Sequence, residues 1–184
     1  MSYHSGNQLL DPYLIFQHAH LQKGMHVADF GCGRTGHIIF PASRIIGEHG
    51  ILYAVDIIKD VLENITKRAR TENLLNVHTV WSDLESVGSS AIPEGSLDAV
   101  FLVNTLHQSN NRHAVLEEAR RLLKDKARLV IADWERDGLP LAPPKGRFVD
   151  WNDLINWSKM HGFAVQEEFQ AGKYHKGVVL FRQS

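Results

Sequence analysis

The sequence has very little cysteine, because Cys32 is the only one among 184 residues. An internal disulfide is therefore excluded, and so is a thiol cluster of the kind that holds zinc. No apolar run reaches the roughly 18 residues that a membrane-spanning helix needs. Residues 1–6 contain no apolar segment typical of a secretion signal. We therefore expect a cytoplasmic protein without a membrane span.

The sequence also lacks an excess of charge of one sign. Its 20 lysines and arginines balance 21 acidic residues, which leaves a net charge of −1. A basic field that would attract nucleic acid is absent, so a nucleic-acid partner is disfavoured. The 11 histidines are scattered, and the pair His18 and His20 points to different sides of a helix, so we expect no metal site. Nothing in the sequence indicates an oligomeric state.

The composition that is present is ordinary for a globular protein, with 43% hydrophobic and 22% charged residues. We expect a single domain over residues 1–184, with a flexible polar segment at 1–11. Asp11 followed by Pro12 is a helix-start signal, so residues 12–24 are expected to hold a helix over the site. Short apolar runs then alternate with helix-patterned runs, which predicts the α/β class.

The alternation predicts seven strands, and the last two are separated by only about seven residues. That link is too short for a parallel crossover, so the seventh strand is expected to run antiparallel. The loop at 135–147 contains three prolines and follows a strand end, so it is expected to shape ligand specificity. The strands are expected at 25–30, 51–56, 77–81, 97–104, 127–133, 163–169 and 177–182, and the later helices at 36–47, 59–73, 111–124 and 151–160.

The most informative stretch is residues 27–36, VADFGCGRTG, a short apolar strand that runs into a glycine-rich turn. Such a turn lets the backbone approach a ligand, and the helix after it offers free N–H groups. Gly31, Gly33 and Gly36 form the pattern G-x-G-x-x-G, and Asp56 lies 20 positions after Gly36. This pattern is typical of dinucleotide binding, so an NAD-binding Rossmann oxidoreductase is one interpretation.

Asp29 favours a different ligand. Its carboxylate is expected to point into the mouth of the turn, where a pyrophosphate would lie, and two negative charges a few Å apart repel each other. A carboxylate suits a ligand that brings a cation to that point. S-adenosylmethionine carries an α-ammonium, a sulfonium and no phosphate. A non-catalytic module that only binds S-adenosylmethionine is a further alternative.

The spacing Asp29-x-Gly31-x-Gly33 resembles motif I of the class I S-adenosylmethionine-dependent methyltransferases. The similarity runs from about residue 12 to the C-terminus and is closest to the small-molecule branch that includes the ubiquinone/menaquinone-biosynthesis C-methyltransferases. The resemblance implies a Rossmann-like, doubly wound seven-stranded sheet of order 3-2-1-4-5-7-6 with strand seven antiparallel. The family usually has its third glycine at the position of Thr35, so a turn one residue longer is expected here.

The resemblance also implies S-adenosyl-L-methionine as the cofactor and S-adenosyl-L-homocysteine as its product. Asp56 is expected to accept both ribose hydroxyls. Asp83 is expected to accept the adenine amino group, although a turn residue is an alternative for it. The expected cofactor-binding residues are Asp29, Gly31, Cys32, Gly33, Gly36, Asp56, Ile57, Ser82, Asp83, Leu84 and Asn104.

Methyl transfer from a sulfonium needs chiefly the alignment of acceptor and methyl group, and a general base only where the acceptor loses a proton. The segment 104–107 faces the methyl group in the family, and His107 is the expected catalytic base. A hydrogen-bonding histidine without a proton-transfer role is an equal alternative. The segment lacks the polar-Pro-Pro-aromatic tetrad of the amino-methylating DNA and RNA enzymes. The expected acceptor contacts are Tyr13, Trp134, Tyr174 and His175.

The expected function is therefore in-line methyl transfer to a small-molecule or lipid-precursor acceptor. Arsenite methyltransferases resemble the core of this chain, but they hold the metalloid with several cysteines. One cysteine cannot do so, which excludes that acceptor.

Overall fold

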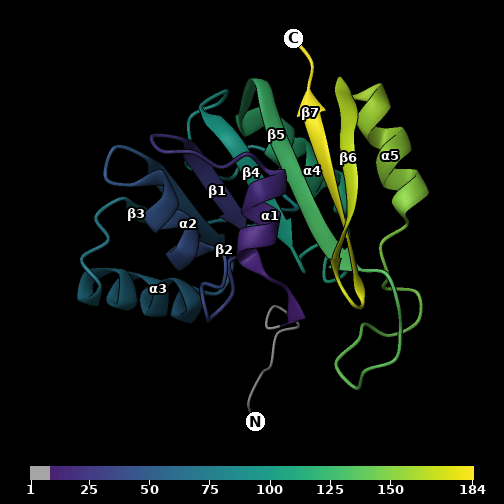
Figure 1. The fold of residues 1–184 in the computed structure, drawn as a ribbon, viewed down its shortest axis with the longest axis horizontal. Coiled ribbons are helices and arrows are strands. Elements are labelled where there is room, and N and C mark those ends of the chain that lie inside the picture. Colours follow the sequence, from purple (N-terminus) through teal and green to yellow (C-terminus); the bar gives the residue numbers. More distant parts are fainter. Residues whose placement is uncertain (1–8) are drawn as a thin grey trace.

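The computed structural model describes residues 9–184, which form a seven-stranded sheet of order β3-β2-β1-β4-β5-β7-β6 (Figure 1). β7 is antiparallel to both β5 and β6, and the other neighbouring strands are parallel. The expected fold class, strand order and antiparallel seventh strand are confirmed. The strands are β1 His26–Phe30, β2 Ile51–Asp56, β3 Val77–Trp81, β4 Leu97–Val103, β5 Leu123–Trp134, β6 Phe163–Gly172 and β7 His175–Arg182.

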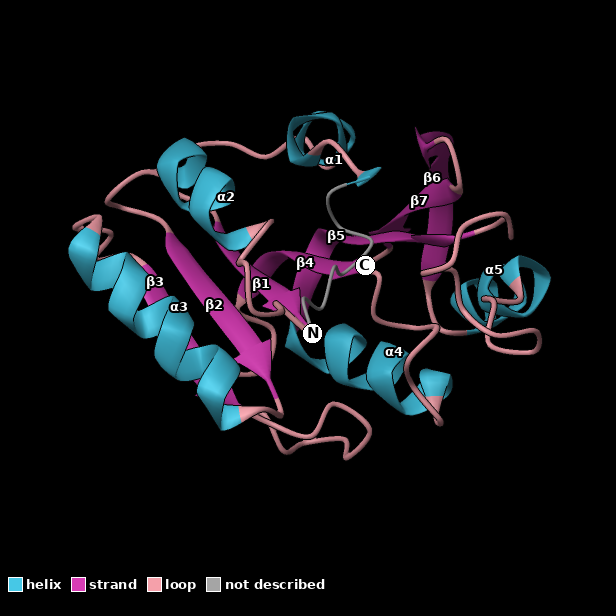
Figure 2. Cartoon of the chain, turned by 90° about the horizontal axis from the view of Figure 1, so that it is seen from below, coloured by secondary structure: helices cyan, strands magenta, loops and turns pink. Residues whose placement is uncertain are grey.

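Helices cover both faces of the sheet (Figure 2). The apolar side chains of α1 (Pro12–His18), α2 (Ile39–Ile46) and α3 (Lys59–Thr71) share one core cluster. Those of α4 (Arg112–Leu122) and α5 (Trp151–Met160) belong to a second cluster on the opposite face. The central strands are buried on both sides by these two layers, as their continuous apolar runs predict. No helix within residues 9–184 is long and apolar enough to cross a membrane.

Local signals explain where several helices begin. The Asp11 carboxylate accepts from the N–H of Tyr13 at the start of α1, and Pro12 is the first helical residue. Asp150 caps α5 in the same way, as its position in the sequence predicts. Pro41 is the third residue of α2, and the N–H groups of a first helical turn have no intrahelical partner, so the ring is tolerated there.

Several element boundaries differ from the sequence-based expectation, among them the end of α1, which is His18 rather than residue 24. α2 begins at Ile39 rather than 36, because Gly36 has a φ of 57° and cannot belong to a right-handed helix. β5 begins at Leu123, directly after α4. β6 and β7 are joined by two residues, 173 and 174, and not by the expected link at 170–176, because their pairing continues to Gly172 and His175.

The carboxyl ends of β1, β2, β4 and β5 lie at one end of the sheet, the lower end in Figure 1. The loop at 135–147, the β6–β7 hairpin and the start of α1 lie at the same end. Ligands of open α/β sheets bind at this edge, outside the carboxyl ends of the strands. Most of the expected site residues are therefore brought to one end of the molecule. The expected flexible segment lies mostly outside the described residues, and Leu10 within it is buried.

Candidate active site

The glycine-rich turn places three glycines in the left-handed region, with φ of 74° at Gly31, 63° at Gly33 and 57° at Gly36. A Cβ on Gly36 would lie 2.4 Å from Cε2 of Phe40 and 2.7 Å from Cδ1 of Ile65. The third glycine is therefore needed at 36 by packing against α2 and α3. A Cβ on Gly33 would meet nothing closer than 3.9 Å, so the backbone there is open to a ligand.

Hydrogen bonds tie this turn to the neighbouring strands. The N–H groups of Gly31 and Cys32 both donate to the carbonyl of Val55, at 2.8 and 3.1 Å. The Asp56 carboxylate at the end of β2 accepts from the N–H of Gly33 at 3.1 Å. Asp56 thus lies at the mouth of the turn, where a diol could replace or share this contact. The sequence predicted its position from spacing alone.

Asp29 is the most perturbed acid of the site. It is only 2% exposed at the end of β1. Burial, and then the negative charge of Asp56, raise the pKa of the Asp29 carboxyl from 3.8 to about 8. Burial, followed by the charges of Asp29 and Asp56, also raises the pKa of the Cys32 thiol well above its usual range. An ammonium group beside Asp29 would favour the ionised form of its carboxyl, whereas a pyrophosphate would disfavour it. The two carboxyl groups therefore fit a ligand with an ammonium group and hydroxyls that donate to them.

The residues expected near an adenine divide into two kinds. Ile57 and Asp83 are exposed beyond β2 and β3, although the Asp83 carboxylate also accepts from the N–H of Glu85 at 3.0 Å, the geometry of a turn residue. Ser82 is buried, and its hydroxyl bonds to the hydroxyls of two neighbouring serines. Leu84 packs against the core. Ser82 and Leu84 thus shape the loop, and Ile57 and Asp83 are accessible to a ligand.

His107, in the turn after β4, is oriented by a carboxylate that sequence reasoning did not single out. Its Nδ1 donates to Oδ1 of Asp133 at 2.8 Å, and its backbone N–H donates to Oδ2 at 3.2 Å. The backbone N–H of Trp134 also donates to Oδ1 of Asp133, at 2.8 Å. The Asp133 side chain is fully buried, while 16% of the His107 side chain is exposed. Because Nδ1 carries the proton, Nε2 of the neutral ring is left as a hydrogen-bond acceptor.

Asn104 lies at the same strand end as His107, at the end of β4. It is buried and has a φ of 55°, and its N–H donates to the carbonyl of Ala132 on β5 at 2.8 Å. Positive φ values at residues other than glycine are uncommon and often accompany functional sites.

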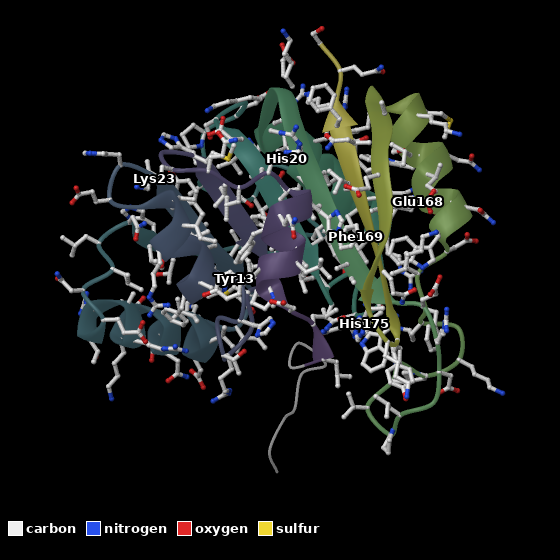
Figure 3. The ribbon with its side chains drawn as sticks, in the orientation of Figure 1. Tyr13, His20, Lys23, Glu168, Phe169 and His175 are labelled. Atoms are coloured by element: carbon white, nitrogen blue, oxygen red, sulfur yellow. The ribbon has the colours of Figure 1, made fainter. Side chains whose placement is uncertain are left out.

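Three of the four expected acceptor contacts come together where β5 pairs with β7. Trp134 and His175 face each other in the strand register, with ring centroids 4.3 Å apart. Tyr174 follows at 6.4 Å from Trp134. Tyr13 is not part of this group, because it is exposed on α1 (Figure 3). His175 is fully buried, and burial lowers its pKa to about 4, although Asp133 acts in the opposite direction.

Two further contacts connect segments around the site, and the sequence did not indicate them. Nε2 of His37, just after the glycine-rich turn, donates to the carbonyl of Leu10 at 2.9 Å. Arg147, at the end of the 135–147 loop, donates to the carbonyl of Gln108 at 2.6 Å and to Oδ1 of Asn110 at 2.9 Å. The loop is thereby fastened to the turn that carries His107.

Comparisons with known proteins agree with this geometry. A family model described as a methyltransferase domain matches residues 21–175. An arsenite methyltransferase of Aquipseudomonas alcaligenes is 25% identical over 157 residues, which cover 78% of this chain and 45% of that protein. A ubiquinone/menaquinone biosynthesis C-methyltransferase of Vibrio cholerae is 26% identical over 130 residues, which cover 70% and 47%. The chain thus spans about half the length of these curated relatives.

Among solved structures, an S-adenosylmethionine-dependent methyltransferase from Aquifex aeolicus superposes with a TM-score of 0.83 at 26% identity. The superposition covers 97% of this chain and 93% of that one. The resemblance therefore includes the whole sheet and both helical layers, and not the glycine-rich turn alone.

Proposed function

This chain belongs to the methyltransferase-domain family of class I S-adenosylmethionine-dependent enzymes, and we propose that it transfers the methyl group of S-adenosylmethionine to a small organic acceptor. The family membership confirms the expected cofactor. The observation that carries the proposal is the buried carboxylate of Asp29 beside that of Asp56, at the mouth of an open glycine-rich turn. That arrangement suits a cationic, hydroxyl-bearing nucleoside and opposes a dinucleotide.

Different residues around the turn are assigned to different parts of this cofactor. We infer that Asp29 pairs with the α-ammonium, Asp56 accepts from the ribose hydroxyls, and the open backbone at Gly33 approaches the ligand closely. Gly31 is needed instead because a Cβ there would lie 3.0 Å from the Thr105 side chain. Ile57 and Asp83 are assigned to the adenine, since both are accessible beyond the strand ends. When bound, S-adenosylmethionine supplies a methyl group already activated by the positive sulfur.

His107 is assigned as the group that removes a proton from the acceptor. Asp133 holds its ring through Nδ1 and its backbone through the N–H, so the lone pair of Nε2 is fixed in direction. An acceptor O–H or N–H would give its proton to Nε2 as the new bond to the methyl group forms. The buried carboxylate would then stabilise the imidazolium that results. General-base catalysis of this kind contributes about 10²–10⁴-fold.

A metalloid acceptor does not fit this chain, although one relative carries an arsenite methyltransferase name. Cys32 is the only cysteine and is 2% exposed. Its raised pKa keeps the sulfur as a thiol, and the thiolate is the form that binds a soft metal or metalloid. We therefore assign the acceptor to organic small molecules.

The test measures formation of S-adenosylhomocysteine with a panel of small organic hydroxyl, carbonyl and amine compounds. With an acceptor found in this way, His107→Ala should lower kcat by about 10²–10⁴-fold and leave the affinity for S-adenosylhomocysteine unchanged. His113→Ala is the matched control, because His113 is an exposed imidazole that also pairs with a carboxylate, Asp153, at 2.8 Å. Full turnover in His107→Ala would remove the base assignment. Failure of the wild-type chain to bind S-adenosylmethionine would remove the function itself.

A further inference from the structure

We propose that His175 is the hydrogen-bonding contact for the acceptor, and that the acceptor therefore presents a neutral hydroxyl or carbonyl oxygen to this imidazole. The inference rests on the proposed methyl transfer and adds to it the chemical class of the acceptor. It concerns a residue at the start of β7, which pairs with β5 on the side away from β1 and the cofactor-binding turn.

The first argument is the hydrogen-bonding state of the ring. His175 has no exposed surface, and within residues 9–184 neither Nδ1 nor Nε2 has a hydrogen-bond partner. A neutral imidazole has one donor and one acceptor, and buried polar groups of native proteins are nearly always paired. Phe and Leu would fill the same place without this cost. An imidazole kept here unpaired therefore points to a ligand that pairs with it.

The second argument is charge. Burial lowers the pKa of His175 to about 4, so the ring is neutral at physiological pH. The groups that face it are Asp133 and His107, and the Asp133 carboxylate already accepts from Nδ1 and the N–H of His107 and from the N–H of Trp134. The one carboxylate that faces His175 is thus already shared among three N–H donors, which disfavours a cationic amine as a further partner. A neutral oxygen matches a ring that can donate once and accept once.

The third argument is the shape of the surroundings. Trp134 lies against the imidazole at 4.3 Å, and Tyr174 lies beyond Trp134 at 6.4 Å. The 135–147 loop reaches the Tyr174 ring, because a Cβ on Gly138 would lie 3.4 Å from it. These flat side chains favour a flat apolar body attached to the oxygen. Such a molecule would place its oxygen at His175 near the turn that carries His107.

The experiment uses the full chain loaded with S-adenosylhomocysteine and three probes of similar size: phenol, toluene and benzylammonium. ¹⁵N NMR of the histidine rings reports their tautomers and hydrogen bonds, and the spectrum of His175→Leu assigns the signals of His175. We expect phenol to shift these signals, toluene to bind at least about tenfold more weakly, and benzylammonium not to bind. His175→Leu should lose at least about tenfold in phenol affinity, and His113→Leu none.

Several results would overturn the proposal. The first is no binding of phenol up to its solubility limit. The second is an affinity for toluene or benzylammonium equal to that for phenol. The third is an unchanged phenol affinity in His175→Leu. If the ¹⁵N signals show that the His175 ring nitrogens are hydrogen-bonded before phenol is added, and they do not respond to phenol, an internal water occupies the place of the methyl acceptor. If His175→Leu does not fold, His175→Asn replaces it, because the asparagine amide can also donate and accept a hydrogen bond. This variant should keep part of the phenol affinity. A phenol affinity in His175→Asn as low as that of the wild-type chain for toluene would count against the proposal.

The proposal and the function on which it rests can fail separately. Titration of each chain with S-adenosylhomocysteine before the probes are added reports the cofactor site, which His175 does not form. If the wild-type chain binds S-adenosylhomocysteine but shows no response of His175 to phenol, only the assignment of His175 is wrong. If S-adenosylhomocysteine itself does not bind, the proposed function is wrong as well.

Discussion

Substitution of Gly36 by alanine tests the packing of the cofactor-binding turn. Gly36 has a φ of 57°, and its Cβ would lie 2.4 Å from the Phe40 ring and 2.7 Å from Ile65. Both neighbours are buried, and the guanidinium of Arg68 lies 3.8 Å from the centre of the Phe40 ring. Neither side chain can move aside without disturbing α2 or α3. The substitution therefore combines backbone strain with overpacking.

Gly95→Ala is the matched control, since Gly95 has a φ of 60° but nothing within 4 Å of its Cβ. Left-handed strain costs about 1–2 kcal/mol in both variants. Overpacking adds about 1–3 kcal/mol in Gly36→Ala alone. We expect the free energy of unfolding to fall by about 1–2 kcal/mol in Gly95→Ala and about 2–5 kcal/mol in Gly36→Ala. At this chain length those losses correspond to Tm decreases of about 2–8 °C and 4–20 °C.

The assay is urea unfolding of both variants beside the wild-type chain, with calorimetric titration of S-adenosylhomocysteine. Gly36→Ala should also lose affinity for the ligand, because the turn can no longer hold its backbone, whereas Gly95→Ala should not. Equal losses of stability in the two variants would refute the account of the turn, since only Gly36 is packed against side chains.

Two further outcomes follow from the buried acids. The Asp29 carboxyl has a pKa of about 8 when folded against 3.8 as a free group, so the folded chain binds more protons between these values. The free energy of unfolding of the wild-type chain should therefore fall as pH rises from about 4 to about 8, by up to about 1.4 kcal/mol per pH unit. Urea unfolding of Asp29→Asn at the same pH values should lack this slope. The same pH dependence in the variant as in the wild-type chain would contradict the burial of the Asp29 carboxyl. Asp133→Asn should lower kcat about 10²–10⁴-fold and leave the affinity for S-adenosylhomocysteine unchanged. The reason is that the amide oxygen cannot accept from all three N–H donors that surround the carboxylate, so the His107 ring loses its orientation. An unchanged kcat would show that the orientation of His107 is unimportant.

Much of the fold could be predicted because its signals are local. β2 and β3 have the expected bounds, 51–56 and 77–81, and α5 begins directly after its Asp150 cap. The start of α2 could not be placed in the same way, because the φ of Gly36 depends on the packing of Phe40 and Ile65 against it. The β6–β7 link was overestimated because the strands pair beyond their apolar residues.

The candidate site shows the same division. Spacing alone predicted that Asp29 and Asp56 lie with the glycines, since parallel strands end at one edge. The pairing of Asp133 with His107 joins positions 26 residues apart, and no periodicity indicates which acid faces which histidine. The complete burial of His175 is likewise a consequence of β7 lying between β5 and β6. Ser82 was expected at the cofactor, but its hydroxyl is engaged by serines of its own loop.

The most direct measurement is the Tm of the chain with S-adenosylmethionine, S-adenosylhomocysteine, NAD and NADP, each in turn. A ligand at 100 times its Kd stabilises the folded chain by about 2.7 kcal/mol, which is a Tm increase of about 5–11 °C at this size. We expect the first two ligands to produce this increase and the two dinucleotides to produce none, because an ammonium group can pair with the buried Asp29 carboxyl, whereas a pyrophosphate would bring further negative charge beside Asp29 and Asp56. An increase with NAD or NADP, or none with S-adenosylhomocysteine, would contradict the assignment of the site.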